Sequence, residues 1–172
     1  LDENMTGNLN LMVNIQSDEE GSLKNPENLL KIERIENYLD SIDVVTSTIS
    51  INDIIKQLHK TVENDDERFN IIPDSRAKVN NLFFLYSQND DSDLSKLINY
   101  ENNSTILTSL MKTFSTTQMG EYKKDIENFI SKELENTDLS FRLSGIMPIL
   151  SEFIWLVIKS SFISIGLSIL II

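Results

Sequence analysis

Residues 8–16 read NLNLMVNIQ, a run in which apolar and polar side chains alternate. Alternation with a period of two is typical of a β-strand with one buried face, because successive side chains point to opposite sides of a sheet. We therefore predict a first strand whose core-facing side chains are Leu9, Leu11, Val13 and Ile15 and whose polar side chains are Asn8, Asn10, Asn14 and Gln16.

A helix is predicted directly after this strand. The polar turn 17–22 leads to Asn25 and Pro26. Asparagine is a preferred N-cap residue, and proline is tolerated at the first helical position because its missing N–H would have no partner there. Apolar side chains then recur every three or four residues, which places on one face Leu29, Ile32, Ile35, Leu39 and Ile42. The segment 44–50, rich in β-branched residues, completes a β-α-β unit.

The second half of the chain repeats this scheme. Residues 105–114 are a β-prone run, and 118–135 form an amphipathic helix with one face carrying Tyr122, Ile126, Phe129 and Leu134. A last strand is predicted where Leu139, Phe141 and Leu143 alternate with Ser140, Arg142 and Ser144. Because β-α-β crossovers are right-handed, two such units combine most simply into a four-stranded antiparallel sheet with both helices on one face. This is the ferredoxin-like split β-α-β fold of the α+β class.

A helical insertion, about 51–99, separates the second and third strands. Ser50 and Asp53 have the spacing of a capping box, and a helical stripe follows at Ile51, Ile54, Ile55 and Leu58. The acidic loop 63–68 ends this helix. After Pro73 a second helix is predicted from Val79, Leu82, Phe83 and Tyr86, with a shorter one around 94–98.

Two placements of the insertion are open. Its helices could pack over the uncovered face of the sheet, in which case the aromatic side chains belong to the core, as consecutive aromatics on a helix more often do. Alternatively the insertion protrudes, and Phe83, Phe84, Leu85 and Tyr86 form a patch for lipid, substrate or a neighbouring subunit. Phe83, Phe84 and Tyr86 are therefore the candidate substrate-path or interface residues.

The end of the chain predicts a membrane helix. Residues 153–172 read FIWLVIKSSFISIGLSILII, with Lys159 as the only charge. About 20 apolar residues are what an α-helix needs to cross a bilayer core of roughly 30 Å. A buried core helix is the alternative, but such a helix normally keeps a polar stripe. Trp155 and Lys159 suit the headgroup layer, so the hydrocarbon span is expected to begin near Ser160. We predict a folded domain over 1–147, then a linker and the start of the membrane helix over 148–172.

Composition argues against several classes of function. The formal net charge is −12, and without a basic run this disfavours nucleic-acid binding and, similarly, binding to anionic lipid headgroups. No cysteine is present, which excludes disulfides, thiolate metal sites and a cysteine nucleophile. His59 has no second histidine or cysteine nearby and is expected at the surface. The acidic clusters lack the EF-hand spacing, and there is no phosphate-binding glycine loop. We expect no enzymatic activity, no cofactor and no metal site.

The ordered set of local motifs resembles a known family. It comprises Gly7 before the first strand, Asn25-Pro26-Glu27 at a helix start, the strand-to-helix junction 45–56, Ile72-Pro73, and Ser144-Gly145 before the apolar helix. This set is similar to the second large extracytoplasmic loop of predicted exporters of the resistance-nodulation-division (RND) superfamily, in the branch with MMPL-type proteins. The resemblance spans nearly the whole chain.

The resemblance implies a porter domain of a proton-motive-force-driven exporter, located on the extracytoplasmic, periplasmic side of the cytoplasmic (inner) membrane. Its implied partners are membrane lipids along the C-terminal helix, hydrophobic or amphiphilic cargo including lipids, and the rest of the same transporter chain, with a homo-oligomer as a further option. The proton relay of such pumps would lie in other membrane helices, because 153–172 holds no acidic residue. The alternative is a membrane-anchored extracytoplasmic binding or sensor domain with a single helix.

Overall fold

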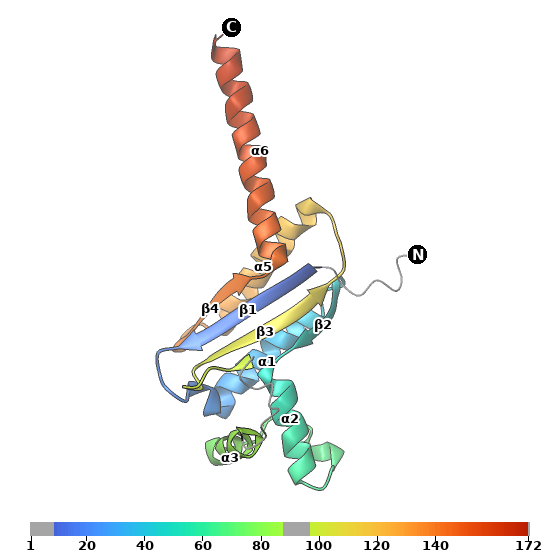
Figure 1. Ribbon diagram of the computed structural model, residues 1–172, viewed down its shortest axis with the longest axis vertical. Helices are drawn as coiled ribbons and strands as arrows, with labels where there is room; N and C mark the ends of the chain where they lie inside the picture. Colours follow the sequence, from blue (N-terminus) through green and yellow to red (C-terminus); the bar gives the residue numbers. More distant parts are fainter. Residues whose placement is uncertain (1–8, 88–96, 172) are drawn as a thin grey trace, which may run out of the picture.

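A computed structural model describes residues 9–87 and 97–171 of the chain as an α+β domain followed by a long helix (Figure 1). Two short 3-10 turns, η1 (Ser22–Lys24) and η2 (Glu67–Phe69), lie in its connections. The strands are β1 (Leu9–Ser17), β2 (Val45–Ile49), β3 (Ser104–Met111) and β4 (Leu139–Ser144). The α-helices are α1 (Pro26–Asp40), α2 (Ile51–Val62), α3 (Arg76–Ser87), α5 (Thr116–Glu133) and α6 (Ile146–Ile171).

The four strands form one antiparallel sheet in the order β2-β3-β1-β4. The central strand β1 pairs with β3 from Leu9 opposite Met111 to Gln16 opposite Ser104. On its other side β1 pairs with β4. The first strand of each β-α-β unit therefore lies between the two strands of the other unit, which is the split β-α-β arrangement. The fold predicted from the sequence is confirmed.

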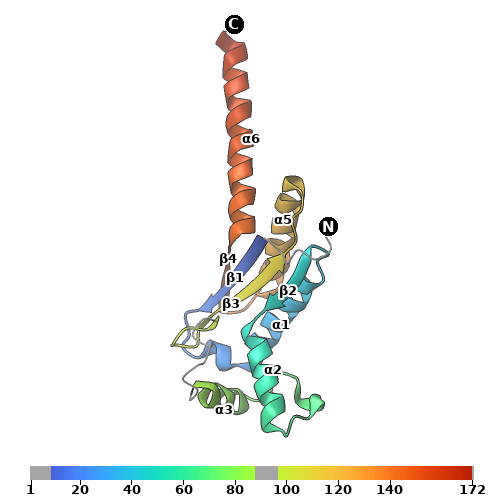
Figure 2. The same cartoon turned by 45° about the vertical axis from the view of Figure 1, so that its right-hand side comes forward.

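Helices α1 and α5 cover one face of the sheet, as predicted (Figures 1 and 2). The predicted core side chains of β1 are buried, and so are those of α1 from Leu29 to Leu39. Between the helices, the Tyr38 and Phe129 rings stack with centroids 3.9 Å apart. Arg34 of α1 also pairs with Glu133 of α5 at 2.6 Å. These contacts fix the two helices as one layer.

The element boundaries differ from the prediction by a few residues. β3 ends at Met111, and α5 begins at Thr116, two residues before the expected start. The cause is a second capping box, in which the Ser115 hydroxyl accepts from the Gln118 backbone N–H at 3.3 Å and the Gln118 side chain accepts from the Ser115 N–H at 3.2 Å. The apolar periodicity alone does not reveal this earlier start.

The insertion lies beyond one end of the sheet, at the end opposite α6 (Figures 1 and 2). It leaves the second sheet face uncovered, since Asn10, Met12 and Asn14 of β1 remain half-exposed on that face. Of the two placements considered, the protruding one is therefore correct for α2 and α3. The short helix expected around 94–98 falls mostly outside the described residues, and Ile98 forms an isolated β-bridge with Thr105.

The apolar helix α6 follows β4 after a single residue, Gly145. The linker expected from residue 148 is helical instead, because Gly145 alone makes the turn. Within the part of the chain that the structure describes, α6 is the one helix long and apolar enough to cross a membrane, over Ile146–Ile169. Only 11% of its most apolar window is buried, whereas a core helix of a soluble domain would be mostly buried.

Candidate functional site

A cleft of about 670 Å³ lies between α3 and the connections that join the sheet to its helices. Phe83 and Phe84 of α3 line one wall. Lys24 of η1 and Tyr100, in the turn before β3, contribute from the other elements. The elements that supply its lining residues, α3, η1 and the turn before β3, lie at the end of the domain away from α6 (Figure 1).

The structure divides the predicted aromatic patch instead of keeping it together. Phe83 is buried and Phe84 is 62% exposed, although both line the cleft. Tyr86 is half-buried and is not among the residues that line the cleft. Neighbouring side chains on an α-helix point about 100° apart, so consecutive aromatics cannot all face the same way. Phe83 is therefore core, and Phe84 is the ring available to a ligand.

Tyr100 is a cleft residue that the sequence analysis missed. Its side chain is 99% exposed although the turn that carries it is well bonded. The Asn99 side-chain oxygen accepts from the backbone N–H groups of Asn103 and Ser104, both at 3.0 Å, and the Asn102 side chain donates to the Tyr100 carbonyl at 3.0 Å. An isolated tyrosine in a polar stretch carries no periodic signal, so no sequence pattern indicates its place beside α3.

The cleft presents both apolar and polar groups. Its walls combine aromatic rings with side-chain amides such as Asn80 and with the charged Glu20 and Lys24. Within residues 9–87 and 97–171 there is no group of three or more histidine, cysteine, aspartate or glutamate side chains that could hold a metal ion. An aromatic surface beside amide and charged groups suits a molecule with both apolar and polar parts.

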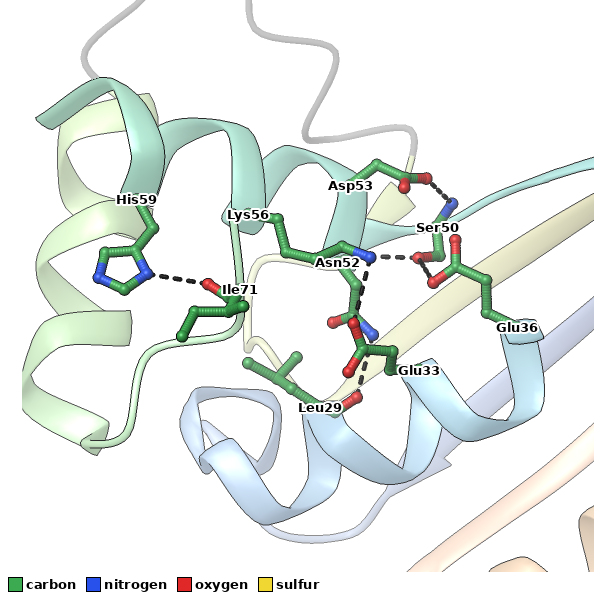
Figure 3. A network of polar contacts seen from close by, with 9 residues as sticks. All are labelled: Leu29, Glu33, Glu36, Ser50, Asn52, Asp53, Lys56, His59 and Ile71. Atoms are coloured by element: carbon green, nitrogen blue, oxygen red, sulfur yellow. Dashed lines mark hydrogen bonds and ion pairs between the residues drawn. The ribbon is translucent and has the colours of Figure 1, made fainter. Parts of the chain in front are cut away.

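A buried polar network joins the insertion to α1 at the junction of β2 and α2 (Figure 3). The predicted capping box is confirmed: Asp53 accepts from the Ser50 N–H at 3.0 Å, and the Ser50 hydroxyl oxygen accepts from the Asn52 N–H at 3.1 Å. The Ser50 hydroxyl also donates to the Glu36 carboxyl at 2.9 Å, and the Asn52 side chain donates to the Leu29 carbonyl at 2.9 Å. The first turn of α2 is thus bonded to two positions on α1.

Glu36 is the titratable group at the centre of this network. It is only 4% exposed. Burial, with a further contribution from the negative charge of Asp53, raises the pKa of Glu36 to about 7. The sequence analysis did not single out Glu36, although its position four residues after Ile32 puts it on the apolar stripe of α1. A charged residue on such a stripe is the signal that could have identified it.

His59 is buried, so the prediction of a surface position was wrong. It follows Ile51 and Ile55 at intervals of four on the packed face of α2. Its Nδ1 lies 2.8 Å from the Ile71 carbonyl oxygen (Figure 3), and because a carbonyl only accepts, Nδ1 carries the proton. The ring also packs edge-on against Phe69 at 5.4 Å. The His59 side chain therefore holds the loop that carries Phe69 and Ile71 against α2.

No protein-family model matches this chain, and comparison with curated proteins finds no significant sequence similarity.

Proposed function

We propose that this chain is the extracytoplasmic porter domain of an RND-type, proton-motive-force-driven exporter of hydrophobic or amphiphilic compounds or lipids. The observation that carries the proposal is the direct connection of the α+β domain to α6 through a single residue, Gly145. In an exporter that cycles between conformations, the extracytoplasmic domain has to follow the movement of its membrane helices, and a flexible linker would prevent that.

The junction at Gly145 is rigid. Gly145 has a φ of +99°, and a Cβ at this position would lie 2.7 Å from the Asn10 carbonyl oxygen, so only glycine fits without distortion. The Asn10 side-chain oxygen accepts from the Ile146 backbone N–H at 2.7 Å and so caps the start of α6 from the central strand. Met147 is fully buried, and Leu150 and Ile154 pack on the same core.

The cleft supports the transport part of the proposal. Phe84 and Tyr100 offer exposed aromatic surface to an apolar group, while Lys24 and Asn80 offer polar contacts to a head group. The cleft lies at the membrane-distal end of a domain that is rigidly attached to α6. A reorientation of α6 would therefore displace the cleft walls that belong to the sheet layers.

A membrane-anchored binding or sensor domain is the second candidate. In this candidate, α6 is the membrane anchor, and its exposed apolar surface supports that role. This alternative uses the same cleft and the same helix, but it predicts ligand binding without net transport. The two candidates are therefore separated by a transport measurement.

The test is efflux of a fluorescent hydrophobic dye from cells that express the full-length gene product containing this chain. Efflux should be lost when the proton gradient is collapsed, and Phe84→Ser should reduce it at unchanged protein level. Ile71→Ser is the matched control, because Ile71 is an exposed apolar residue of the same insertion that does not line the cleft. Dye efflux that is absent, or that does not depend on the proton gradient, would remove the exporter proposal. Wild-type efflux by the Phe84→Ser variant would exclude the cleft from the path.

A further inference from the structure

At the base of α6, side chains that pack on the domain and exposed apolar side chains lie on the same turns, with no polar spacer between them. Met147, Leu150 and Ile154 pack against the domain core. Over the same two turns, Ile149 and Phe153 are 64% and 62% exposed. Apolar side chains are thus presented to the surroundings at the level where α6 still contacts the domain. A domain held away from the bilayer would leave these side chains in water.

The depth of the bilayer along α6 can be worked out from helix geometry. The hydrocarbon span is expected to begin near Ser160, which at 1.5 Å per residue lies about 7.5 Å beyond Trp155 along the helix axis. The Lys159 ammonium lies 5.7 Å from the centre of the Trp155 ring, and helical side chains lean toward the helix N-terminus. Lys159 is therefore directed back toward the domain, as expected of a lysine that snorkels to the headgroups. This places the headgroup layer near Trp155.

Helix α5 reaches the same level from the domain side. Lys123 of α5 pairs with Glu152 of α6 at 2.7 Å. The two helices run in opposite directions, α5 leading away from the base of α6 while α6 leads away from the domain (Figures 1 and 2). Residues before Lys123 consequently lie farther toward the bilayer, and Thr116 is seven residues earlier, a rise of about 10 Å. Among the described residues of the domain, the segment 112–120 therefore reaches toward the headgroup layer beside the base of α6.

The chemistry of the segment 112–120 suits lipid headgroups. It reads KTFSTTQMG and contains no acidic residue in a chain of net charge −12. Its exposed side chains are Lys112, Thr113 and the residues 115–118, all with hydrogen-bonding groups. The positive end of the α5 dipole adds to the charge of Lys112. The acidic loops at 18–20 and 63–67 lie at the opposite end of the domain (Figure 1). Two of the nearby acidic side chains have partners, since Asp43 accepts from the Tyr122 hydroxyl and Glu152 pairs with Lys123.

We infer that the segment 112–120 is a membrane-contact surface that seats the domain directly on the lipid headgroup layer, next to the entry of α6 into the bilayer. This inference rests on the proposed function insofar as α6 must span a membrane. The occupant of the surface is the headgroup layer of the bilayer that α6 enters, which the exposed Ser, Thr and Gln side chains can contact by hydrogen bonds.

The test uses Trp155, the single tryptophan of the chain, as a depth probe. The chain is reconstituted into phosphatidylcholine–phosphatidylglycerol vesicles that carry a nitroxide quencher either at the headgroup or near the end of the acyl chain. Trp155 should lose most of its fluorescence to the headgroup quencher. In a Trp155→Phe background, Thr117→Trp should also be quenched at the headgroup and not by the deep probe. Thr113→Trp, outside the helix, repeats this measurement should Thr117→Trp fail to fold by circular dichroism.

The matched control is Tyr100→Trp in the same background. Tyr100 is fully exposed but lies before the opposite end of β3, so this variant should be quenched by neither lipid probe. Quenching of Trp155 without quenching at residues 113 and 117 would overturn the inference and leave the membrane span intact. Absence of quenching at Trp155 itself would remove the span, and with it the proposed function.

Discussion

Replacing Glu36 by glutamine should abolish a pH dependence of stability that the buried carboxyl creates. Burial raises the pKa of Glu36 to about 7 in the folded protein, whereas in the unfolded chain this pKa has its ordinary value of 4.5. Unfolding therefore releases a proton between these pH values, and the free energy of unfolding falls as the pH rises through them. A difference of one in pKa corresponds to about 1.4 kcal/mol. The free energy of unfolding is therefore about 3 kcal/mol lower at pH 8 than at a pH below both pKa values.

The amide in Glu36→Gln reproduces the protonated carboxyl. Its oxygen can accept from the Ser50 hydroxyl, and its NH₂ group can donate to Asp53, a group that already interacts with Glu36. The variant should match the wild-type protein at pH 5 and exceed it by up to about 3 kcal/mol at pH 8. Urea unfolding of the chain in detergent micelles, followed by far-ultraviolet circular dichroism at both pH values, measures this difference.

Glu33→Gln is the control for Glu36→Gln. It removes one acidic group from the same helix, but Glu33 is partly exposed and pairs with Lys56 at 3.2 Å. Loss of this pair should cost less than about 1 kcal/mol at either pH. Equal stability changes for Glu36→Gln at pH 5 and pH 8 would refute the reasoning, because they would show that the folded state does not hold the Glu36 proton more tightly than the unfolded chain.

Four further outcomes follow from the packing and can be read from urea or thermal unfolding. Gly145→Ala should destabilise the domain by about 1–3 kcal/mol because of the positive φ and the contact with Asn10, whereas Gly120→Ala, in an open helical position, should stabilise it by up to about 1 kcal/mol. Phe83→Ala should cost about 3–5 kcal/mol, as for a buried aromatic. Phe84→Ala should change stability by less than about 0.5 kcal/mol, so a large loss there would contradict its exposed position.

The strands and caps were predictable because their signals are local. Alternation over residues 8–16 specifies which side chains of β1 are buried, and the right-handed crossover rule then leaves one simple arrangement for two β-α-β units. Ser50 and Asp53 form their capping box within four residues of chain. These features need no information about distant segments.

The candidate site was less predictable because it depends on contacts between distant segments. His59 is buried only because the loop that carries Ile71 folds back onto α2. Tyr100 gains its place in the cleft from the packing of α3 beside the turn before β3. Glu36 is covered by the start of α2, which follows it by 15 residues. A single sequence shows the amphipathic face of each helix but not the partner that covers it.

Because Asn10 caps α6 from the central strand, the domain and α6 are expected to turn together as one rigid body, like the two arms of a lever. The pivot is the meeting point of β1 and α6, with the candidate membrane-spanning helix α6 as one arm and the sheet with its insertion as the other. If the bilayer holds the pivot in place, a tilt of the membrane arm swings the insertion toward the opposite side. Small changes deep in the membrane would then appear, with reversed sense, at the tip farthest from it.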